Sequence, residues 1–462
     1  MAAKAKKRAP KSMPADPNTV DAAPTKELLI QSLVKDIPLT RAIVDLVDNS
    51  VDGARGIRGK KDYSGLFVHL RISNEAFEIE DNCGGMSVEI ARDYAFRFGR
   101  PADMPNRLKT PHSVGQFGVG MKRAIFKLGR AFSVESTTNN SHFLVKENVD
   151  EWKTRKNADN KELWNFRFNQ PLIEGKPPPQ NMRRGTTIKV TKLLAEVARE
   201  MNTDSFINEL SSELSAAHEL SIGKGLEIKL NNKLIGYEPS KLYSSTRIQP
   251  AKKRLKKIQD NSKIDIVLYA GIYRSKPSKA AGWYLYCNDR LILRADQSGI
   301  TGWGENVGER IPKFHPQFAR FRGYVFLDCD DPALLPWNTT KTGLDTDGDL
   351  YKGVRREMNI LARPVIDFLN DLDAEKKKVA RPLQALVEKM DKTDNTHVLL
   401  SDIKRVGDFV RPPRKAVEKP ESVDIKYKRP IREVEALKQF FGVSKPSEVG
   451  EKTFDFVYEL EG

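Results

Sequence analysis

Hydrophobic and polar positions follow two different periods in the first part of the chain. From Lys26 to Ala54 the apolar residues recur every three or four positions, which predicts a helical stretch interrupted at Pro38. The segments LFVHLRI (66–72) and AFEIEDN (76–82) alternate with period two, and the turn residues SNE separate them. We therefore expect a helical layer followed by a pair of strands.

The same patterns continue to the end of the chain. GVGMKRAIFKLG begins a helix behind glycines, whereas AFSVEST, HFLVKEN and TTIKVTKL predict strands. The pattern changes near residue 200, where we place a domain boundary. The second region combines a helical segment, SFINELSSELSAAHEL, with strands such as KIDIVLYAGIY, GWYLYCNDRLIL and RGYVFLD, and ends in a helix over about 348–379. We expect an α/β fold with domains at 25–200 and 201–380.

The two ends have a different composition. Residues 1–24 are rich in Ala, Lys and Pro without periodicity, which predicts a disordered basic arm. Residues 381–462 read as a charged, Pro-interrupted linker followed by two or three small helices. The segment 99–114 contains three prolines and little apolar patterning, so we expect a loop there.

Composition favours a soluble cytoplasmic protein. The 462 residues are 39% hydrophobic and 30% charged, no apolar run is long enough to span a membrane, and the basic N-terminus lacks the apolar core of a secretory signal. The three cysteines are far apart and have no CxxC spacing, so they predict neither a disulfide framework nor a zinc site. We expect no membrane partner and a reducing compartment.

The net charge of +16 is clustered. The basic residues gather in the N-terminal arm, in KKRLKK (252–257) and in EKKKVAR (375–381). Such clusters fit nucleic acid as a partner, but they also fit solvated surface segments, and both interpretations stay open.

Acidic residues occupy one face of an otherwise apolar helix. In IVDLVDNSVDGARG (43–56), Asp45, Asp48, Asn49 and Asp52 fall within an arc of roughly 100° when the chain is wound as a helix. Oxygen ligands of this kind suit Mg²⁺, which keeps several waters and shares phosphate oxygens, and Asp45 is placed one turn earlier to orient an attacking water. We expect this face to point into a pocket.

Three further motifs supply the other parts of a nucleotide site. Asp81, in IEDNCGGMS (79–87), ends a strand and is an acceptor suited to an exocyclic amine such as that of adenine. In GQFGVGMKRA (115–124), Gly115, Gly118 and Gly120 free backbone amides at a helix start to hold phosphates, and Lys122 adds charge. RGTTIKV (184–190) is the last motif. Neither a Walker P-loop nor a Rossmann fingerprint is present.

Taken in this order, the four motifs resemble those of the GHKL ATPases, the Bergerat-fold group that includes gyrase B subunits, MutL, MORC proteins, heat-shock chaperones and sensor histidine kinases. The resemblance covers roughly residues 25–370 and implies an α/β sandwich that binds ATP and Mg²⁺. It makes Asn49 the metal ligand, Asp81 the adenine-reading residue and Thr186 a floor residue, and it makes 99–114 an ATP lid hinged at Gly115–Gly120. The nucleotide-contacting residues it implies also include Asp52, Gly85, Met86 and Val119.

The sequence departs from the family pattern at two positions. Asp45 stands where gyrase, MutL and chaperone members have a glutamate base, which implies slow hydrolysis. Cys83 replaces the first glycine of D-x-G-x-G.

The second region resembles the transducer domain of MutL-like members. YLYCNDRLIL (284–293) is similar to a strand of that domain with the motif VNGR. PWNTTKTGLD (336–345) is similar to the loop from which that domain sends a lysine to the γ-phosphate of ATP, and Lys341 is the candidate for this lysine. The resemblance therefore implies an ATP-dependent homodimer that acts as a nucleotide-gated clamp, and DNA is its partner if the basic clusters bind nucleic acid. The alternative is a chaperone-like ATPase that acts on protein clients, although few residues remain after 380 for client and dimerisation domains. A sensor histidine kinase is disfavoured because no histidine precedes the motifs.

Overall fold

The computed structural model describes residues 24–35, 37–99, 110–115, 118–158, 160–273, 278–304, 311–338, 340–378, 397–412 and 423–461. The chain divides into two compact units, Met1–Arg411 and Pro412–Gly462. The described part of the first unit contains two large sheets, each with its own hydrophobic core, and a small two-stranded sheet. The predicted α/β class, with a helical C-terminal region, is confirmed.

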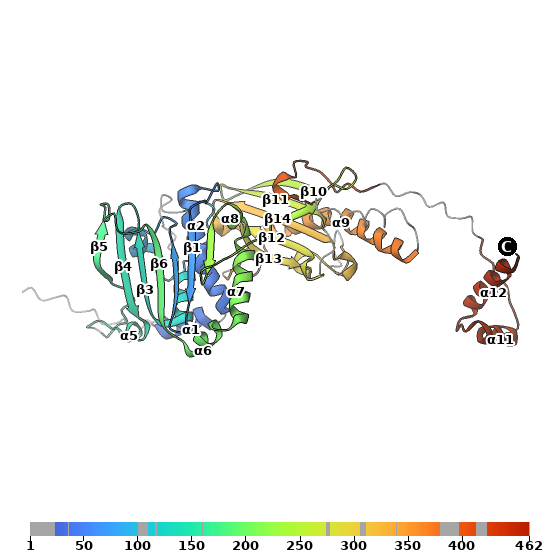
Figure 1. Cartoon of the computed structure of the whole chain (residues 1–462), viewed down its shortest axis with the longest axis horizontal. Coiled ribbons are helices and arrows are strands. Elements are labelled where there is room, and N and C mark those ends of the chain that lie inside the picture. Colours follow the sequence, from blue (N-terminus) through green and yellow to red (C-terminus); the bar gives the residue numbers. More distant parts are fainter. Residues whose placement is uncertain are drawn as a thin grey trace, which may run out of the picture. The chain divides into compact units, whose positions relative to one another are not determined.

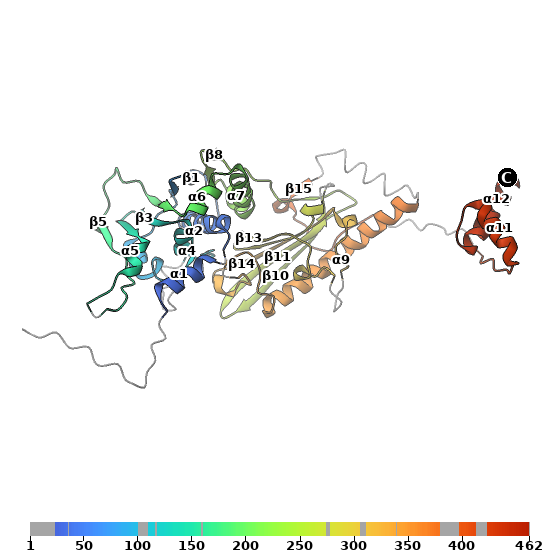
Figure 2. The same ribbon diagram turned by 90° about the horizontal axis from the view of Figure 1, so that it is seen from below.

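The first core is built on an eight-stranded sheet covered by helices (Figures 1 and 2). Helix α1 ends before Pro38, whose extended backbone separates it from α2, as predicted. The elements are α1 (Lys26–Lys35), α2 (Leu39–Arg58), β1 (Phe67–Ile72), β2 (Ala76–Asp81), α3 (Val88–Ile90), the π-helical turn η1 (Ala91–Ala95), α4 (Gly120–Leu128), β3 (Gly129–Thr137), β4 (Ser141–Asn148), α5 (Val149–Thr154), β5 (Phe168–Glu174), β6 (Gly185–Leu193), α6 (Ala195–Met201), α7 (Asp204–Ala217), α8 (Glu219–Gly223), β7 (Glu227–Leu230) and β8 (Lys233–Leu234).

The strand order β5-β4-β3-β6-β2-β1-β7-β8 brings distant motifs together. The strands are antiparallel except for β1 and β7, which pair in parallel. The register of β2 and β6 places Asp81 directly opposite Thr186. Two of the four sequence motifs therefore meet at one end of neighbouring central strands.

The second core lies between a five-stranded sheet, in the order β10-β11-β14-β12-β13, and the long helix α9 (Figure 2). Its aromatic and aliphatic side chains come from β11, β14 and one face of α9. The elements are β9 (Lys241–Tyr243), β10 (Ala251–Gln259), β11 (Ser262–Ile272), β12 (Gly282–Cys287), β13 (Arg290–Asp296), β14 (Phe321–Cys329), α9 (Asp349–Lys378) and β15 (His397–Leu399), which pairs with β9.

The division between the cores differs from the predicted boundary at residue 200. Helix α7 buries Phe206, Leu210 and Leu214 in the first core, and β7 extends the first sheet, so this core continues to Ile235. On the other side, residues 397–411 pack on the second sheet through residues such as Ile403, although we predicted a linker from 381. Periodicity gives the elements but not the sheet that each one joins.

The C-terminal unit contains a helix pair, α11 (Ile431–Phe441) and α12 (Pro446–Glu461), which confirms the helices predicted for this segment. Gly442 caps the end of α11, and its φ of 64° is left-handed. The rings of Phe440 and Phe441 pack against Phe456 between the two helices.

The basic run KKRLKK is not a uniformly exposed patch. It forms most of strand β10, so its side chains alternate between the two faces of the sheet. Lys252 is buried over the ring of Tyr269 and donates to the carbonyl of Ile403, whereas Arg254 and Lys256 are exposed. Only part of this run is therefore available to a polyanion.

Three predicted features lie largely outside the described residues. They are the basic arm at 1–24, of which only Pro24 is described, the side chains of the run 375–381, and the central part of the lid, residues 100–109. Among the described residues, no helix is long and apolar enough to cross a membrane.

Candidate functional site

A cavity of about 280 Å³ opens between α2, the ends of β2 and β6, and the start of α4. Each residue that the sequence analysis assigned to nucleotide, metal or catalysis lines this cavity. They are Asp45, Asn49, Asp52, Asp81, Gly85, Met86, Gly115, Gly118, Val119, Gly120, Lys122, Thr186 and Lys341. The structure thus places these residues together, including one from the second core.

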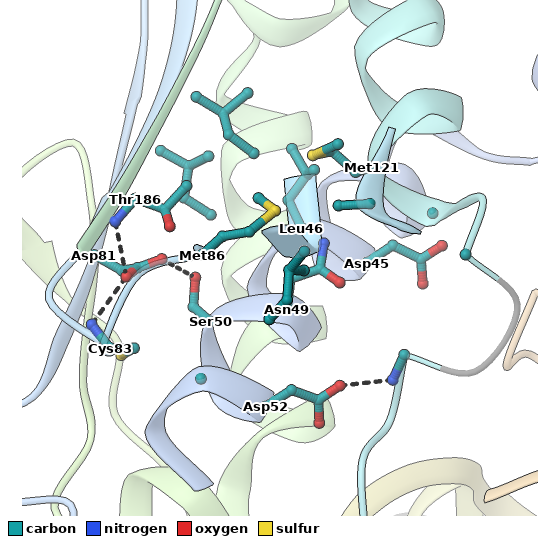
Figure 3. A pocket seen from close by; sticks show the side chains of 18 of the residues that line it. Asp45, Leu46, Asn49, Ser50, Asp52, Asp81, Cys83, Met86, Met121 and Thr186 are labelled. Atoms are coloured by element: carbon teal, nitrogen blue, oxygen red, sulfur yellow. Dashed lines mark hydrogen bonds between the residues drawn. The ribbon is translucent and has the colours of Figure 1, made fainter. Parts of the chain in front are cut away.

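Helix α2 supplies the acidic wall. Its apolar residues are buried in the first core, while Asn49 is exposed between buried neighbours and its side chain points into the cavity (Figure 3). Asp45 lies one turn before Asn49 and is 2% exposed. Asp52 lies one turn after it and accepts hydrogen bonds from the amides of Val114 and Gly115, both at 2.7 Å. Burial raises the pKa of the Asp52 carboxyl.

Asp81 is fixed by three hydrogen bonds at the end of β2 (Figure 3). Its Oδ2 accepts from Ser50 Oγ at 2.7 Å, and its Oδ1 accepts from the amides of Cys83 at 2.9 Å and Thr186 at 3.3 Å. Burial raises the pKa of the Asp81 carboxyl. Because a carboxylate offers about four acceptor positions, one remains for a donor in the cavity.

The turn after Asp81 brings backbone close to the cavity floor. Gly84 and Gly85 have φ values of 95° and 72°, which disfavour any residue with a side chain. A Cβ on Gly85 would lie 2.3 Å from the carbonyl oxygen of Thr137, so only glycine fits. The pattern D-x-C-G-G therefore keeps glycine at the two positions where the backbone requires it.

The glycine motif lies against the acidic helix face. A Cβ on Gly115 would be 3.1 Å from Asp52 Oδ2 and 3.5 Å from Asn49 Oδ1, and one on Gly120 would be 3.5 Å from Asp45 Oδ2. Helix α4 begins at Gly120 without a side-chain cap. Its first amides therefore have no side-chain acceptor, and they face a cavity that is also lined by carboxylates of α2. A phosphate group with a bound cation can bridge the two, because the amides bind the phosphate and the carboxylates attract the cation.

Lys122 has a different environment from the one that the sequence suggested. Its Nζ donates to the carbonyl oxygen of Ala95 at 2.6 Å and also to that of Gly118. Burial lowers its pKa to about 7. The ammonium therefore ties α4 to the turn η1 at the edge of the cavity, and its charge is not aimed at the space beside Asn49.

Asp45 sits between two cations. Arg123 of α4 pairs with its Oδ2, and Lys341 Nζ lies 3.5 Å from its Oδ1. Lys341 comes from the loop between β14 and α9, is 5% exposed and has a left-handed φ of 53°. The second core thus contributes a buried cation to the nucleotide-sized cavity of the first.

Asp48 anchors the same lysine more closely. Its Oδ2 is 2.8 Å from Lys341 Nζ and its Oδ1 is 2.8 Å from Arg290 Nε, which comes from β13. Burial opposes ionisation of Asp48, but the charges of Arg290 and Lys341 outweigh it, so the pKa of this carboxyl lies well below its usual range. His218 lies 3.7 Å away, and burial lowers its pKa to about 3, which leaves it neutral at pH 7.

Several of these contacts were missed in the sequence. The roles of Ser50, Arg123, Arg290 and His218 depend on partners more than 30 positions away, as for Ser50 and Asp81. One local signal was available, since Arg290 is a charged residue between the apolar strand segments YLYC and LIL. A charge in such a position predicts a buried partner.

The donor set fits a magnesium–nucleotide complex better than a metal held by protein alone. Within the described part of the chain, no three His, Cys, Asp or Glu side chains are grouped so as to hold a metal ion. Mg²⁺ typically takes one or two protein oxygens and completes its shell with phosphate and water. The Asn49 side chain, which points into the cavity near Asp52, offers such an oxygen.

Comparison with known families agrees with this geometry for the first core. Residues 37–171 match the family model described as histidine kinase-, DNA gyrase B- and HSP90-like ATPase, which supports a GHKL-type ATPase domain in this segment. The match covers less than a third of the 462 residues and does not reach the second core. A comparison with curated proteins gave no match.

Proposed function

We propose that this chain is a Mg²⁺-dependent ATPase in which ATP closes a clamp between two subunits, in the manner of MutL- and MORC-like proteins. The observation that carries the proposal is the position of Lys341. This lysine belongs to the second core and yet lines the cavity that holds the four nucleotide motifs. A cation delivered from another core can distinguish ATP from ADP, because only ATP presents a terminal phosphate there.

The remaining residues receive roles from their positions. The free acceptor of Asp81 takes the exocyclic amine of adenine, and the start of α4 at Gly120 takes phosphate oxygens. Asn49 would hold Mg²⁺, which would supply positive charge beside the phosphates. Asp45 orients that water, and its pairing with Arg123 keeps the carboxylate oriented toward the cavity.

Duplex DNA is the proposed client because the chain carries a net charge of +16. The test is the rate of ATP hydrolysis by the full chain with duplex DNA, with an unfolded polypeptide and with neither. Stimulation by DNA that weakens as salt concentration rises supports the proposal. Stimulation by the polypeptide alone would favour the chaperone-like function, and turnover insensitive to DNA would reject DNA as the client.

The clamp itself is tested through Lys341. Lys341→Ala should still bind nucleotide but lose turnover and nucleotide-induced dimerisation, because the contact that reports the terminal phosphate is gone. Lys352→Ala, on the exposed side of α9, is the matched control and should behave as wild type. Analytical ultracentrifugation with a non-hydrolysable ATP analogue and with ADP measures the outcome. If the wild-type chain has the same size with both nucleotides, ATP-gated closure is wrong.

A further inference from the structure

A second cavity, of about 250 Å³, lies away from the nucleotide motifs. Helices α7 and α8 of the first core form one wall, and strands β12, β13 and β14 form the other. Figure 1 shows α7 and α8 beside the second sheet. It lies on the face of the second sheet opposite α9, where Tyr269, Tyr286 and Tyr324 form a separate small core. Nothing in the proposed ATPase cycle uses this cavity.

Arg322 is the principal cation of the cavity. It lies on β14 and is 3% exposed. Its Nη1 donates to the carbonyl oxygens of Ala319 and Phe321, at 3.0 and 2.7 Å, and its guanidinium lies 5.5 Å from the ring centre of Tyr273. Among the described residues no carboxylate lies within 4 Å of this guanidinium. Burial lowers the pKa of Arg322, and the charge of Glu238, which also lines the cavity, opposes this shift only in part.

Arg322 lines the cavity and has donors that no described hydrogen bond uses. A guanidinium has five N–H groups in a planar fork, and the two described bonds engage Nη1 alone. Arg294 adds a second cation to the lining, and its Nη1 lies 3.4 Å from Ser212 Oγ on α7. Two arginines and a hydroxyl are the groups that bind phosphate or another small anion.

The rest of the wall suits a planar polar body. Tyr284 and Tyr324 line the cavity as a stacked pair, with ring centres 5.3 Å apart and planes 24° from parallel. Glu219 of α8 is half-buried beside them and accepts a hydrogen bond from Ser240 Oγ at 2.7 Å. Its remaining acceptor positions can take N–H groups of a ligand, as an amine-bearing ring provides.

We infer that this cavity binds a small phosphate-bearing molecule, with the anion on Arg322 and Arg294 and a planar, hydrogen-bond-donating body between the tyrosines and Glu219. A nucleoside monophosphate has this chemistry. Since the ligand would contact α7 and α8 on one side and the second sheet on the other, it would favour the present arrangement of the two cores and so couple to any step that moves them.

The experiment measures binding of AMP and of inorganic phosphate to the full chain, by calorimetry for AMP and by ³¹P line broadening for phosphate. The variants are Arg294→Gln, which is exposed and tolerant, and Arg322→Lys, which keeps the charge but loses the fork. Arg254→Gln, exposed on β10, is the matched control for the loss of one charge. Asp81→Asn shows whether AMP binds at the first cavity instead, because only binding there should be lost in this variant.

We expect both probes to bind at least tenfold more weakly to Arg294→Gln and Arg322→Lys, with no change in Arg254→Gln or for phosphate in Asp81→Asn. If the wild-type chain binds phosphate but not AMP, and the arginine variants lose phosphate binding, the anion site is supported and its ligand is free phosphate. The inference is overturned if neither probe binds the wild-type chain, if the arginine variants bind as wild type, or if AMP binding is lost only in Asp81→Asn. None of these outcomes depends on ATP turnover, so the proposed function is tested separately.

Discussion

Replacing Asp48 by asparagine removes a fully buried anion that links the two cores. Asp48 is fully buried on α2 in the first core, and its two cationic partners, Arg290 and Lys341, come from β13 and from the loop before α9. Asparagine keeps the size of the side chain but loses its charge and turns an acceptor into a donor on one side. Either the lysine or the arginine then faces an amide N–H₂.

The cost can be estimated from the number of partners lost. Breaking a buried ion pair by removing one partner costs about 3–5 kcal/mol, because a desolvated charge is left without compensation. Lys341 keeps a weaker contact with Asp45 at 3.5 Å, but no other carboxylate in the described structure lies within 4 Å of Arg290. We therefore expect Asp48→Asn to lower the free energy of unfolding by about 3 kcal/mol at pH 7.

The assay is urea unfolding of the nucleotide-free chain, followed by circular dichroism and by tryptophan fluorescence. Asp52→Asn is the matched control, since it makes the same change one turn later on α2. Asp52 is held by two backbone amides, and burial raises its pKa rather than lowering it. Asp52→Asn leaves one of these amides facing an N–H₂ group, which should cost about 1–2 kcal/mol, less than the loss of the two Asp48 ion pairs.

The pH dependence has a definite sign. Because the pKa of Asp48 is depressed in the folded state, its stabilisation is complete above the unfolded value of about 4 and is lost as the pH falls below that value. The difference between wild type and Asp48→Asn should therefore shrink below pH 4. If Asp48→Asn costs no more than Asp52→Asn at pH 7, the view that the charge of Asp48 stabilises the contact between the cores is refuted.

Three further predictions concern the nucleotide cavity. Asn49→Ala should lose the magnesium-dependent part of ATP affinity and Asp81→Asn should weaken ATP binding, with little change in stability, and calorimetry showing wild-type affinity in both would contradict the site. Asp45→Asn should bind ATP and lose turnover, while Asp45→Glu should turn over at least as fast as wild type; steady-state rates decide, and full activity in Asp45→Asn would assign the base elsewhere. The pKa of Lys122 falls from 10.5 to about 7 on folding, so this lysine should add stability as the pH rises from 7 to 10. In urea unfolding, the free energy of unfolding of wild type should therefore rise by up to about 1.4 kcal/mol per pH unit relative to that of Lys122→Met. Parallel pH profiles of the two proteins would exclude this titration.

The sequence was most informative where local pattern decides structure. The break at Pro38, the paired strands β1 and β2, and the start of α4 behind glycines follow from proline geometry, alternation and glycine permissiveness, and each is confirmed. The same rules placed candidate residues on a helix face, at a strand end and at a helix start. Those three positions surround one cavity in the fold, which is why motif order carried so much information.

Pairing between distant segments could not be obtained in this way. Strand β5 has alternation too weak to mark it, and the strand character of KKRLKK is hidden because its lysines occupy both faces of β10. The destination of Lys252, buried over Tyr269, depends on the neighbouring strand. A charge run is read as surface unless the partner that buries it is known.

The contacts of Lys341 also lead to a prediction about nucleotide preference. In this arrangement Asp48 and Asp45 hold its ammonium, and they raise its pKa although burial alone would lower it. A terminal phosphate must compete with these carboxylates, so part of the contact energy is spent on exchanging partners. Asp48→Asn removes the closer competitor at 2.8 Å and frees the lysine for the phosphate.

A charge-assisted hydrogen bond contributes about 1.5–3 kcal/mol, and every 1.4 kcal/mol is a factor of ten in affinity. The measurement is made at pH 7 without urea, and circular dichroism checks that the variant is folded. Under these conditions Asp48→Asn should raise the ratio of ATP to ADP affinity by about tenfold, while its ADP affinity stays close to that of wild type. Lys341→Ala in the same background should return the ratio to a low value, because the gain requires the lysine. Calorimetry with ADP and a non-hydrolysable ATP analogue gives both ratios. A gain that persists without Lys341, or an unchanged ratio in Asp48→Asn, would mean that this lysine does not sense the terminal phosphate from its present position.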